Sequence, residues 1–263
     1  MIIDLTGKRA VVTGSTAGIG FAIAKGLAES GAQVVINGRT RGRVDEALAE
    51  LKNSAKAAVS GIAADLATAD GAAAFVKQAN EADILVNNLG IFEPKAFAEI
   101  TDDDWRRFFD TNVMSGIRMA RHYLPRMVQN NWGRIVFISS ESGVNIPAEM
   151  IHYGMTKTAQ LAVARGLAES VAGSGVTVNS VLPGPTRSEG VVDFFGKMAK
   201  DAGVSQAQME DDFIAQHRPT SIIKRLASPE EVANMVVYVC STQASATTGA
   251  ALRVEGGLLR GIA

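Results

Sequence analysis

The chain has 263 residues, 47% of them hydrophobic, which suits one large α/β domain or two small ones with a sizeable core. Its 26 basic and 27 acidic residues nearly balance without long runs of one sign, and no apolar run approaches the roughly 20 residues of a membrane span, so we expect neither a nucleic-acid nor a membrane partner. The single cysteine, Cys240, cannot form an intramolecular disulfide, and residues 1–8 lack a signal-peptide pattern, so we expect a cytoplasmic location.

Short β-branched runs alternate with longer helical patterns along the chain, which is typical of βαβ units in a parallel sheet. We predict strands at Arg9–Thr13, Gln33–Asn37, Ala58–Ala63, Ile84–Asn87, Arg134–Ser139, Val176–Leu182 and Ala250–Val254. We predict helices at Ile19–Ser30, Gly42–Asn53, Ala69–Asn80, Asp102–Gln129, Tyr153–Ala172 and Pro229–Cys240. Gly31 is expected to cap the end of the first helix, and Ser228 to open a capping box at the start of the last one. The pattern predicts a single doubly wound α/β domain over residues 1–263.

Residues 186–227 interrupt this alternation. The segment is rich in Phe, Met and Gln, contains no predicted strand, and shows apolar residues at helical spacing only from Val191 to Met198. Loops this long inside a domain are uncommon and often cover an active site. We therefore expect a substrate-binding lid here, which favours a bulky or apolar substrate.

Three glycines, Gly14, Gly18 and Gly20, lie between the first predicted strand and the first predicted helix. Glycine lets the backbone approach a pyrophosphate, while a helix N-terminus offers free N–H groups and positive potential. Such a spacing is a weak signal alone, because it also suits a structural tight turn. Its position between a strand and a helix favours a dinucleotide site.

The spacing of these glycines resembles that of the short-chain dehydrogenase/reductase family, and further motifs follow in the order of that family. They are Asn87-Asn88-Leu89-Gly90, Asn112, Ser140, Tyr153-Gly154-Met155-Thr156-Lys157 and Pro183-Gly184. The resemblance covers essentially the whole chain. It implies a Rossmann-like, seven-stranded parallel sheet with helices on both faces, and an NAD(P)-dependent oxidoreductase that interconverts a carbonyl and a secondary alcohol. Leu89 departs from the usual alanine of its turn, and this predicts a tighter cofactor pocket.

Tyr153 and Lys157 are four residues apart, so in a helix they share one face. A free tyrosine titrates near pH 10, and a nearby cation favours the phenolate and lowers its pKa. The pair therefore suits a general acid/base, although an isolated pair at this spacing is more often a surface contact. The other motifs favour the catalytic interpretation.

The resemblance implies a role for each site residue. Tyr153 would exchange a proton with the substrate oxygen, Ser140 would hydrogen-bond that oxygen, and Lys157 would lower the pKa of the tyrosine and hold the nicotinamide ribose. Asn112 would fix a helix irregularity that anchors a water of the proton relay. Neighbouring Ser139 is expected to bond the backbone instead. The implied cofactor contacts are Gly14, Ser15, Thr16, Gly18, Ile19, Gly20, Arg39, Asp65, Leu66, Asn88, Gly90, Tyr153, Lys157, Pro183, Gly184 and Thr186.

Some of these contacts have a specific part of the cofactor assigned by the resemblance. Asp65 would bind the adenine amino group, Asn87 would lie next to the adenine ribose, and Thr186 would hold the carboxamide. Asp65 and Asn87 could equally cap the end of a strand. No metal-ligand pattern occurs among the three histidines, and we expect no metal.

The end of the second strand, Asn37-Gly38-Arg39, predicts the choice of cofactor. NAD-specific enzymes place a carboxylate here to accept hydrogen bonds from the ribose 2′-hydroxyl, and that carboxylate would repel a 2′-phosphate. This sequence has no acid at that point, and the guanidinium of Arg39 suits a phosphate dianion. NADP(H) is therefore expected over NAD(H), although an arginine so close to a helix start could also be merely solvated.

Other functions remain open at this stage. A non-catalytic dinucleotide-binding sensor would keep the glycines but lose the tyrosine, lysine or serine, whereas this sequence has all three. A 3-oxoacyl thioester reductase would need a basic surface for an acidic carrier protein, for which Arg118, Arg121 and Arg126 are candidates. The resemblance also implies a homotetramer, with the helices Asp102–Gln129 and Tyr153–Ala172 at its interfaces. The sequence leaves the small-molecule substrate unidentified.

Overall fold

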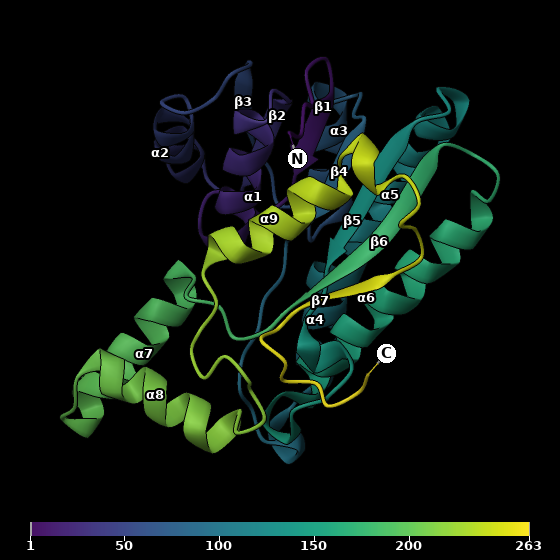
Figure 1. The fold of residues 1–263 in the computed structure, drawn as a ribbon. Helices are drawn as coiled ribbons and strands as arrows, with labels where there is room; N and C mark the ends of the chain where they lie inside the picture. Colours follow the sequence, from purple (N-terminus) through teal and green to yellow (C-terminus); the bar gives the residue numbers. More distant parts are fainter. Residues whose placement is uncertain (1, 263) are drawn as a thin grey trace.

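A parallel sheet of seven strands lies at the centre of the computed structural model, which describes residues 2–262 apart from the side chain of Phe194 (Figure 1). The strand order is β3-β2-β1-β4-β5-β6-β7, and every neighbouring pair is parallel. The strands are β1 (Arg9–Val12), β2 (Gln33–Gly38), β3 (Val59–Ala63), β4 (Ile84–Asn87), β5 (Gly133–Ile138), β6 (Val176–Pro183) and β7 (Ala251–Val254). This confirms the predicted fold class. The order reverses between β1 and β4, and ligands of such sheets bind at the carboxyl ends of the strands on either side of this point.

Helices cover both faces of the sheet and enclose two apolar cores. Ile23 and Val236 belong to the first core, and Phe75, Tyr123 and Phe137 to the second, and all are buried. One face carries α1 (Gly18–Glu29), α2 (Arg41–Leu51) and α9 (Pro229–Val239), and the other carries α3 (Ala69–Gln78), α5 (Ser115–Gln129) and α6 (Ile151–Ser170). Because both faces of the central strands are covered, β4, β5 and β6 are buried along their whole length.

The predicted helix over Asp102–Gln129 is in fact interrupted. It consists of α4 (Asp102–Phe109), a π-helical turn η2 (Asp110–Met114) and α5. A π turn accommodates one extra residue and shifts the backbone hydrogen bonds, which frees a carbonyl for other partners. Asn112 lies within this turn, where the family resemblance places a helix irregularity.

Local capping follows the sequence closely. Gly31 has a φ of +96° directly after the end of α1, a conformation that favours glycine. Ser228 accepts a hydrogen bond from the backbone of Glu231, whose side chain bonds back to the Ser228 N–H, so the predicted capping box is present. Four short 3₁₀ turns complete the described elements, namely η1 (Phe97–Glu99), η3 (Glu141–Gly143), η4 (Ala148–Met150) and η5 (Thr242–Ala244).

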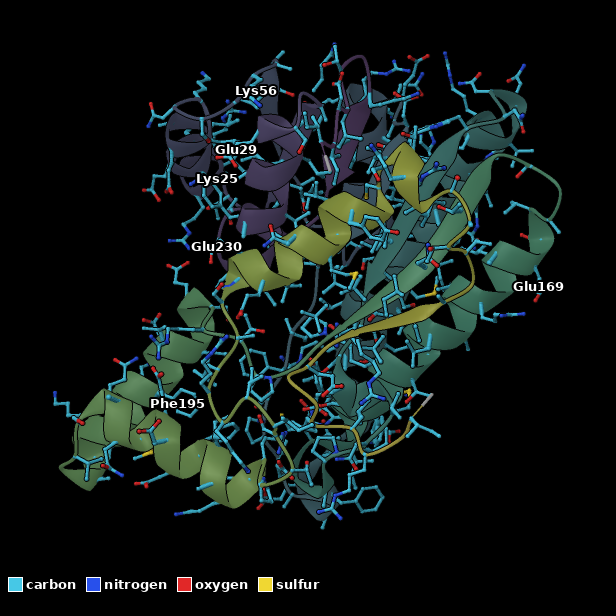
Figure 2. The ribbon with its side chains drawn as sticks, in the orientation of Figure 1. Lys25, Glu29, Lys56, Glu169, Phe195 and Glu230 are labelled. Atoms are coloured by element: carbon cyan, nitrogen blue, oxygen red, sulfur yellow. The ribbon has the colours of Figure 1, made fainter. Side chains whose placement is uncertain are left out.

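Residues 186–227, predicted as a long loop with one helical stretch, contain two helices, α7 (Glu189–Ala202) and α8 (Gln206–His217). A single bridge between Thr186 and Ala227 closes the base of the segment. In Figures 1 and 2 the pair lies apart from the helices that cover the sheet, and Phe195 of α7 packs on Phe213 of α8 with ring centroids 5.0 Å apart. A small apolar cluster of its own thus holds the segment together. No helix among residues 2–262 is long and apolar enough to cross a membrane.

Candidate active site

The glycine loop joins β1 to α1 at the carboxyl edge of the sheet. Gly14 and Gly18 have φ values of +58° and +56°, in the region that favours glycine. A Cβ at Gly20 would lie 2.4 Å from the side chain of Asn88 and 2.5 Å from a backbone oxygen, so only glycine fits there. No side chain caps the N-terminus of α1, which leaves its N–H groups available for a phosphate. The loop therefore fits a dinucleotide.

Two asparagines hold the loop in shape. The Asn88 side chain donates to the carbonyl oxygens of Thr13 at 3.0 Å and Gly14 at 2.8 Å, and these two bonds stabilise the start of the loop. Asn37, a residue that sequence reasoning treated only as the end of a strand, accepts from the Gly14 N–H at 3.2 Å and donates to the end of β3. Ser15 is fully buried and bonds Val12 and Asn37, so its hydroxyl is structural.

A cavity of about 170 Å³ lies beside the glycine loop, between the ends of β2 and β3. Thr16, Leu66, Leu89 and Arg39 line it, and a Cβ at Gly14 would lie 3.3 Å from the side chain of Leu89. Arg39 is exposed and forms no ion pair with another described residue, whereas Arg41 and Arg43 pair with acids. The cavity has the position expected of an adenosine pocket.

A second cavity, of about 220 Å³, brings together the residues of the predicted reaction. Ser140 comes from the end of β5, and Tyr153 and Lys157 come from α6. The Lys157 ammonium nitrogen lies 5.6 Å from the centre of the Tyr153 ring. The cavity is also lined by six further predicted cofactor contacts, namely Ile19, Asn88, Gly90, Pro183, Gly184 and Thr186. Five segments far apart in the sequence therefore meet in one pocket.

The protonation of Tyr153 and Lys157 differs from the expectation. Although the Tyr153 ring keeps some exposure to the cavity, burial raises the pKa of its phenol to about 12, and the nearby Ser140 hydroxyl offsets only part of this rise. Burial likewise lowers the pKa of the Lys157 ammonium to about 7. The Lys157 nitrogen donates to the carbonyl oxygen of Ile138 at 2.8 Å. Desolvation therefore has the larger effect on both groups in this arrangement, and the pKa of the phenol stays raised with Lys157 nearby.

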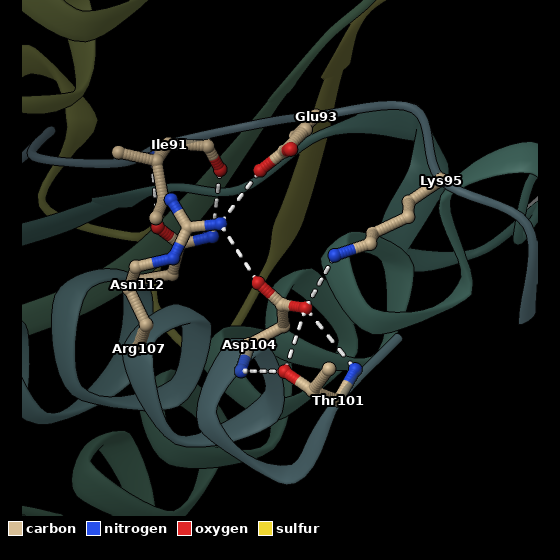
Figure 3. A network of polar contacts seen from close by, with 7 residues as sticks. All are labelled: Ile91, Glu93, Lys95, Thr101, Asp104, Arg107 and Asn112. Atoms are coloured by element: carbon tan, nitrogen blue, oxygen red, sulfur yellow. Dashed lines mark hydrogen bonds and ion pairs between the residues drawn. The ribbon is translucent and has the colours of Figure 1, made fainter. Parts of the chain in front are cut away.

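Asn112 connects the π turn to the loop after β4 (Figure 3). Its side-chain oxygen accepts from the Ile91 N–H at 2.8 Å, and its amide donates to the Ile91 carbonyl at 3.0 Å and to Thr156 at 2.9 Å. The main-chain oxygen of Asn112 accepts from the Gln160 amide at 2.6 Å. Asn112 thus holds the loop and α6 together directly behind the catalytic pocket.

Ion pairs extend this connection along the same loop. Arg107 of α4 bonds Glu93 at 2.6 Å and Asp104 at 3.2 Å, and Lys95 bonds Asp104 at 2.6 Å (Figure 3). The anchored loop carries Phe92, whose ring lies edge-on to Tyr153 with centroids 6.4 Å apart. The loop that borders the pocket is therefore fixed at several points by α4.

The remaining predicted residues take different positions. Ser139 donates to the Lys157 carbonyl at 2.8 Å, as expected of a residue that bonds the backbone. Asp65 is exposed and accepts from the Ala67 N–H at 3.1 Å, and it does not line the adenosine-side cavity. Asn87 is buried on the side of the sheet that faces Gly116 and is not among the residues that line the two cavities, so its contact with the adenine ribose stays a prediction.

Sequence reasoning missed two charged residues of the catalytic pocket. Glu141 directly follows Ser140 and is 3% exposed, and Arg218 follows the end of α8. The Arg218 Nε donates to Glu141 at 3.2 Å. An acid beside the predicted serine was a visible signal for Glu141, whereas nothing in the sequence distinguishes Arg218 from other arginines of the segment.

The comparisons with known proteins agree with this geometry. Residues 14–259 match the family model described as enoyl-(acyl carrier protein) reductase. The chain is 48% identical over the full length of both proteins to the uncharacterized oxidoreductase YvrD of Bacillus subtilis, and 32% identical to the 3-oxoacyl-[acyl-carrier-protein] reductase FabG of Aquifex aeolicus, with 98% of this chain and all of FabG covered.

Among solved structures, L-sorbose reductase from Gluconobacter frateurii, in complex with NADPH and L-sorbose, is similar over the full length of both chains. The TM-score is 0.94 and the sequence identity 34%. The matched family model, the identity to these relatives, the parallel sheet and the grouping of the motif residues all lead to one assignment. The chain belongs to the short-chain dehydrogenase/reductase family and is an oxidoreductase.

Proposed function

We propose that the chain is an NADP(H)-dependent enzyme that interconverts a carbonyl and a secondary alcohol, with Tyr153 as the general acid/base. The observation that carries this proposal is the presence of Tyr153, Ser140 and Lys157 in one cavity, next to a glycine loop that fits a dinucleotide. The L-sorbose reductase complex supports it, because L-sorbose carries a ketone and that enzyme is similar over its whole length.

Each residue has a defined part in the proposed reduction. When bound, NADPH supplies the hydride that adds to the carbonyl carbon. Ser140 donates a hydrogen bond to the carbonyl oxygen, and Tyr153 transfers its phenolic proton to that oxygen, which gives the alcohol. Lys157 stabilises the resulting phenolate, and its ammonium holds the nicotinamide ribose. Asn112 acts behind them by holding the loop and α6 in register.

The substitution Tyr153→Phe tests this proposal. It removes the proton donor and keeps the ring, so turnover is expected to fall by about 10²- to 10⁴-fold. The Kd for NADPH, measured by the fluorescence of the bound nucleotide, is expected to stay within about twofold. Turnover close to that of the unmodified enzyme would exclude Tyr153 as the general acid/base.

The preference for NADP(H) is supported by the end of β2. A Cβ at Gly38 would lie 2.5 Å from the Thr16 methyl group and 3.2 Å from Val44, so the carboxylate that NAD-specific enzymes place here does not fit without rearrangement. Arg39 follows with an unpaired guanidinium beside the cavity. We propose that Arg39 binds the 2′-phosphate, and that the glycine loop, Leu66 and Thr186 bind the remainder of the cofactor.

A 3-oxoacyl thioester reductase is the second candidate, favoured by the FabG relatives. Such an enzyme is expected to carry a basic surface for its carrier protein. Here Arg118 bonds the Ala67 carbonyl and Arg126 pairs with Glu81, so of the three candidate arginines only Arg121 keeps its charge available for a carrier protein among the described residues. Reduction of a 3-oxoacyl thioester with a higher kcat/KM than simple ketones would favour this function. A non-catalytic sensor would instead bind NADPH and leave its fluorescence unchanged in the presence of any carbonyl compound.

Assembly and lid function are also proposals. We propose that residues 186–227 act as a substrate-binding lid, since Thr186, Ser188 and Val191 line the catalytic cavity. We also propose a homotetramer in which α4, α5 and α6 contact neighbouring subunits. Phe109 and Val128 on these helices are 39% and 41% exposed, which suits such contacts. A monomeric mass in light scattering at micromolar concentration would contradict the tetramer.

We also propose a cytoplasmic location, which fractionation of cells would test.

A further inference from the structure

Glu141 is a buried acid beside Ser140 that the proposed reaction does not use. It opens the short turn η3, is 3% exposed, and lines the same cavity as Ser140 and Tyr153. Arg218 reaches this wall from the end of α8, with a side chain that is 11% exposed, and donates from Nε to the Glu141 carboxylate at 3.2 Å. The wall of the pocket next to the reacting atoms therefore carries a buried ion pair.

The Glu141 carboxylate has capacity for further hydrogen bonds. An ionised carboxylate accepts about four, and buried polar groups in proteins are normally satisfied. The Arg218 Nε donates to it, and the Ser142 hydroxyl is a second hydrogen-bonding neighbour, so two described side chains use part of this capacity. Desolvation raises the pKa of Glu141 in spite of these neighbours, which is consistent with an incompletely satisfied carboxylate. A ligand that donates hydrogen bonds would occupy the acceptor positions of the Glu141 carboxylate that remain free.

The charges around Glu141 restrict what this ligand can be. Arg218 also faces a second acid, Glu149, with 3.6 Å between the Nη1 and the carboxylate, so one guanidinium serves two carboxylates. A carboxylate or phosphate on the substrate would therefore meet excess negative charge at this wall. Lys157, which lines the same cavity with its nitrogen 5.6 Å from the centre of the Tyr153 ring, disfavours a cationic group. A neutral hydroxyl group satisfies both constraints.

The ion pair also lies close to the reacting atoms. Glu141 and Arg218 line the same cavity as Ser140 and Tyr153, and Glu141 is the direct neighbour of Ser140 in the chain. A hydroxyl bonded to Glu141 would therefore be carried by a carbon near the carbonyl. We propose that Glu141 determines substrate specificity by accepting a hydrogen bond from such a hydroxyl, so that the substrates are neutral hydroxyketones and the corresponding diols. This inference rests on the proposed carbonyl reduction.

Three small ketones of similar size test the inference. They are 1-hydroxy-2-butanone, 3-pentanone, in which a methyl replaces the hydroxyl, and 2-oxobutanoate, in which a carboxylate replaces the hydroxymethyl group. A hydrogen bond to a charged group is stronger than one between neutral groups. We therefore expect kcat/KM for the hydroxyketone to exceed that for 3-pentanone by about 10- to 150-fold. The oxo acid is expected to be the poorest substrate.

Variants of Glu141 and Glu149 locate the effect. In Glu141→Gln the carboxylate charge is lost at constant size, and the preference for the hydroxyketone over 3-pentanone is expected to fall by about tenfold or more. Glu149→Gln is the matched control, because Glu149 faces the same arginine but is half-exposed and does not adjoin Ser140. It is expected to keep the preference. Glu141→Asp, which withdraws the carboxylate by one methylene, should also reduce the preference if Glu141→Gln proves unstable in thermal denaturation.

The outcomes separate this inference from the proposed function. If 3-pentanone or 2-oxobutanoate is reduced as efficiently as the hydroxyketone, or if Glu141→Gln and Glu141→Asp keep the preference, the role of Glu141 is wrong and the proposed carbonyl reduction stands. If NADPH binds but no ketone or secondary alcohol in a broader screen reacts, the proposed function itself is wrong.

Discussion

Removal of the Arg39 guanidinium is expected to abolish most of the preference for NADPH. Arg39 is the arginine near the end of β2 that lines the adenosine-side cavity and forms no ion pair with another described residue. A charge-assisted hydrogen bond contributes about 1.5–3 kcal/mol, which corresponds to a preference of about 10- to 150-fold in kcat/KM. Because Arg39 is exposed and salt screens exposed charges, we expect a value near the lower end at physiological ionic strength.

Initial rates with one carbonyl substrate, measured over a range of NADPH and then NADH concentrations, give the two values of kcat/KM. Arg39→Ala should lower the value for NADPH by about tenfold and leave the value for NADH nearly unchanged. Arg41→Ala is the matched control, because the Arg41 guanidinium pairs with Asp45 at 3.0 Å and does not line the cavity. The ratio for this control should equal that of the unmodified enzyme.

A second substitution at the same place tests the steric part of the argument. Gly38→Asp introduces the acid of NAD-specific enzymes, but its Cβ would lie 2.5 Å from the Thr16 methyl group. We therefore expect this variant to be less stable and to remain a poor NADH enzyme. The reasoning is refuted if the unmodified enzyme uses NADH as well as NADPH, or if Arg39→Ala lowers kcat/KM for both cofactors equally.

Three further changes address the buried lysine, a helix cap and the segment proposed as a lid. Lys157→Met is expected to raise the free energy of unfolding while abolishing activity, because burial lowers the pKa of Lys157 from 10.5 to about 7 and folding must neutralise a lysine that stays charged when unfolded. In urea denaturation the gain should be largest at or below about pH 7 and should disappear above about pH 10; a gain independent of pH would contradict it. Ser228→Ala removes the side-chain cap of α9 and should cost about 1 kcal/mol in the same assay, with Ser228→Asn close to the unmodified protein. Replacement of residues 189–217 by a short Gly/Ser linker should raise the substrate KM more than the NADPH Kd, whereas equal effects on both would indicate a purely structural segment.

Much of the fold could be predicted from the sequence because its signals are local. The seven strands are short β-branched runs, α1 is followed by a glycine with a left-handed φ, and α9 begins with a capping box. Each of these depends on neighbouring residues only, so the sequence contains the information directly. The placement of Tyr153 and Lys157 in one helix follows from the same local rule, since residues four apart share a face.

The π turn at Asp110–Met114 was not predicted from the apolar pattern, because the residues on either side of it fit one continuous helix. The second helix of the segment 186–227, Gln206–His217, was missed because its sequence is rich in polar residues and has little apolar periodicity. The extra residue of a π turn and the packing of α8 on α7 are both stabilised by contacts with other segments. Local patterns do not record such contacts.

The sequence by itself determined which chemical groups this protein has: the glycines of the loop, the serine, the tyrosine and lysine of one helix, and an arginine directly after the position where an acid would select NAD. Only the tertiary structure decided how those groups are surrounded. It buried Tyr153 and Lys157, which raises the pKa of the tyrosine and lowers the pKa of the lysine, and it brought Arg218, which follows α8, to Glu141, 77 positions away in the chain. Burial and long-range contacts arise from the packing of distant segments, and a pattern of neighbouring residues cannot encode them.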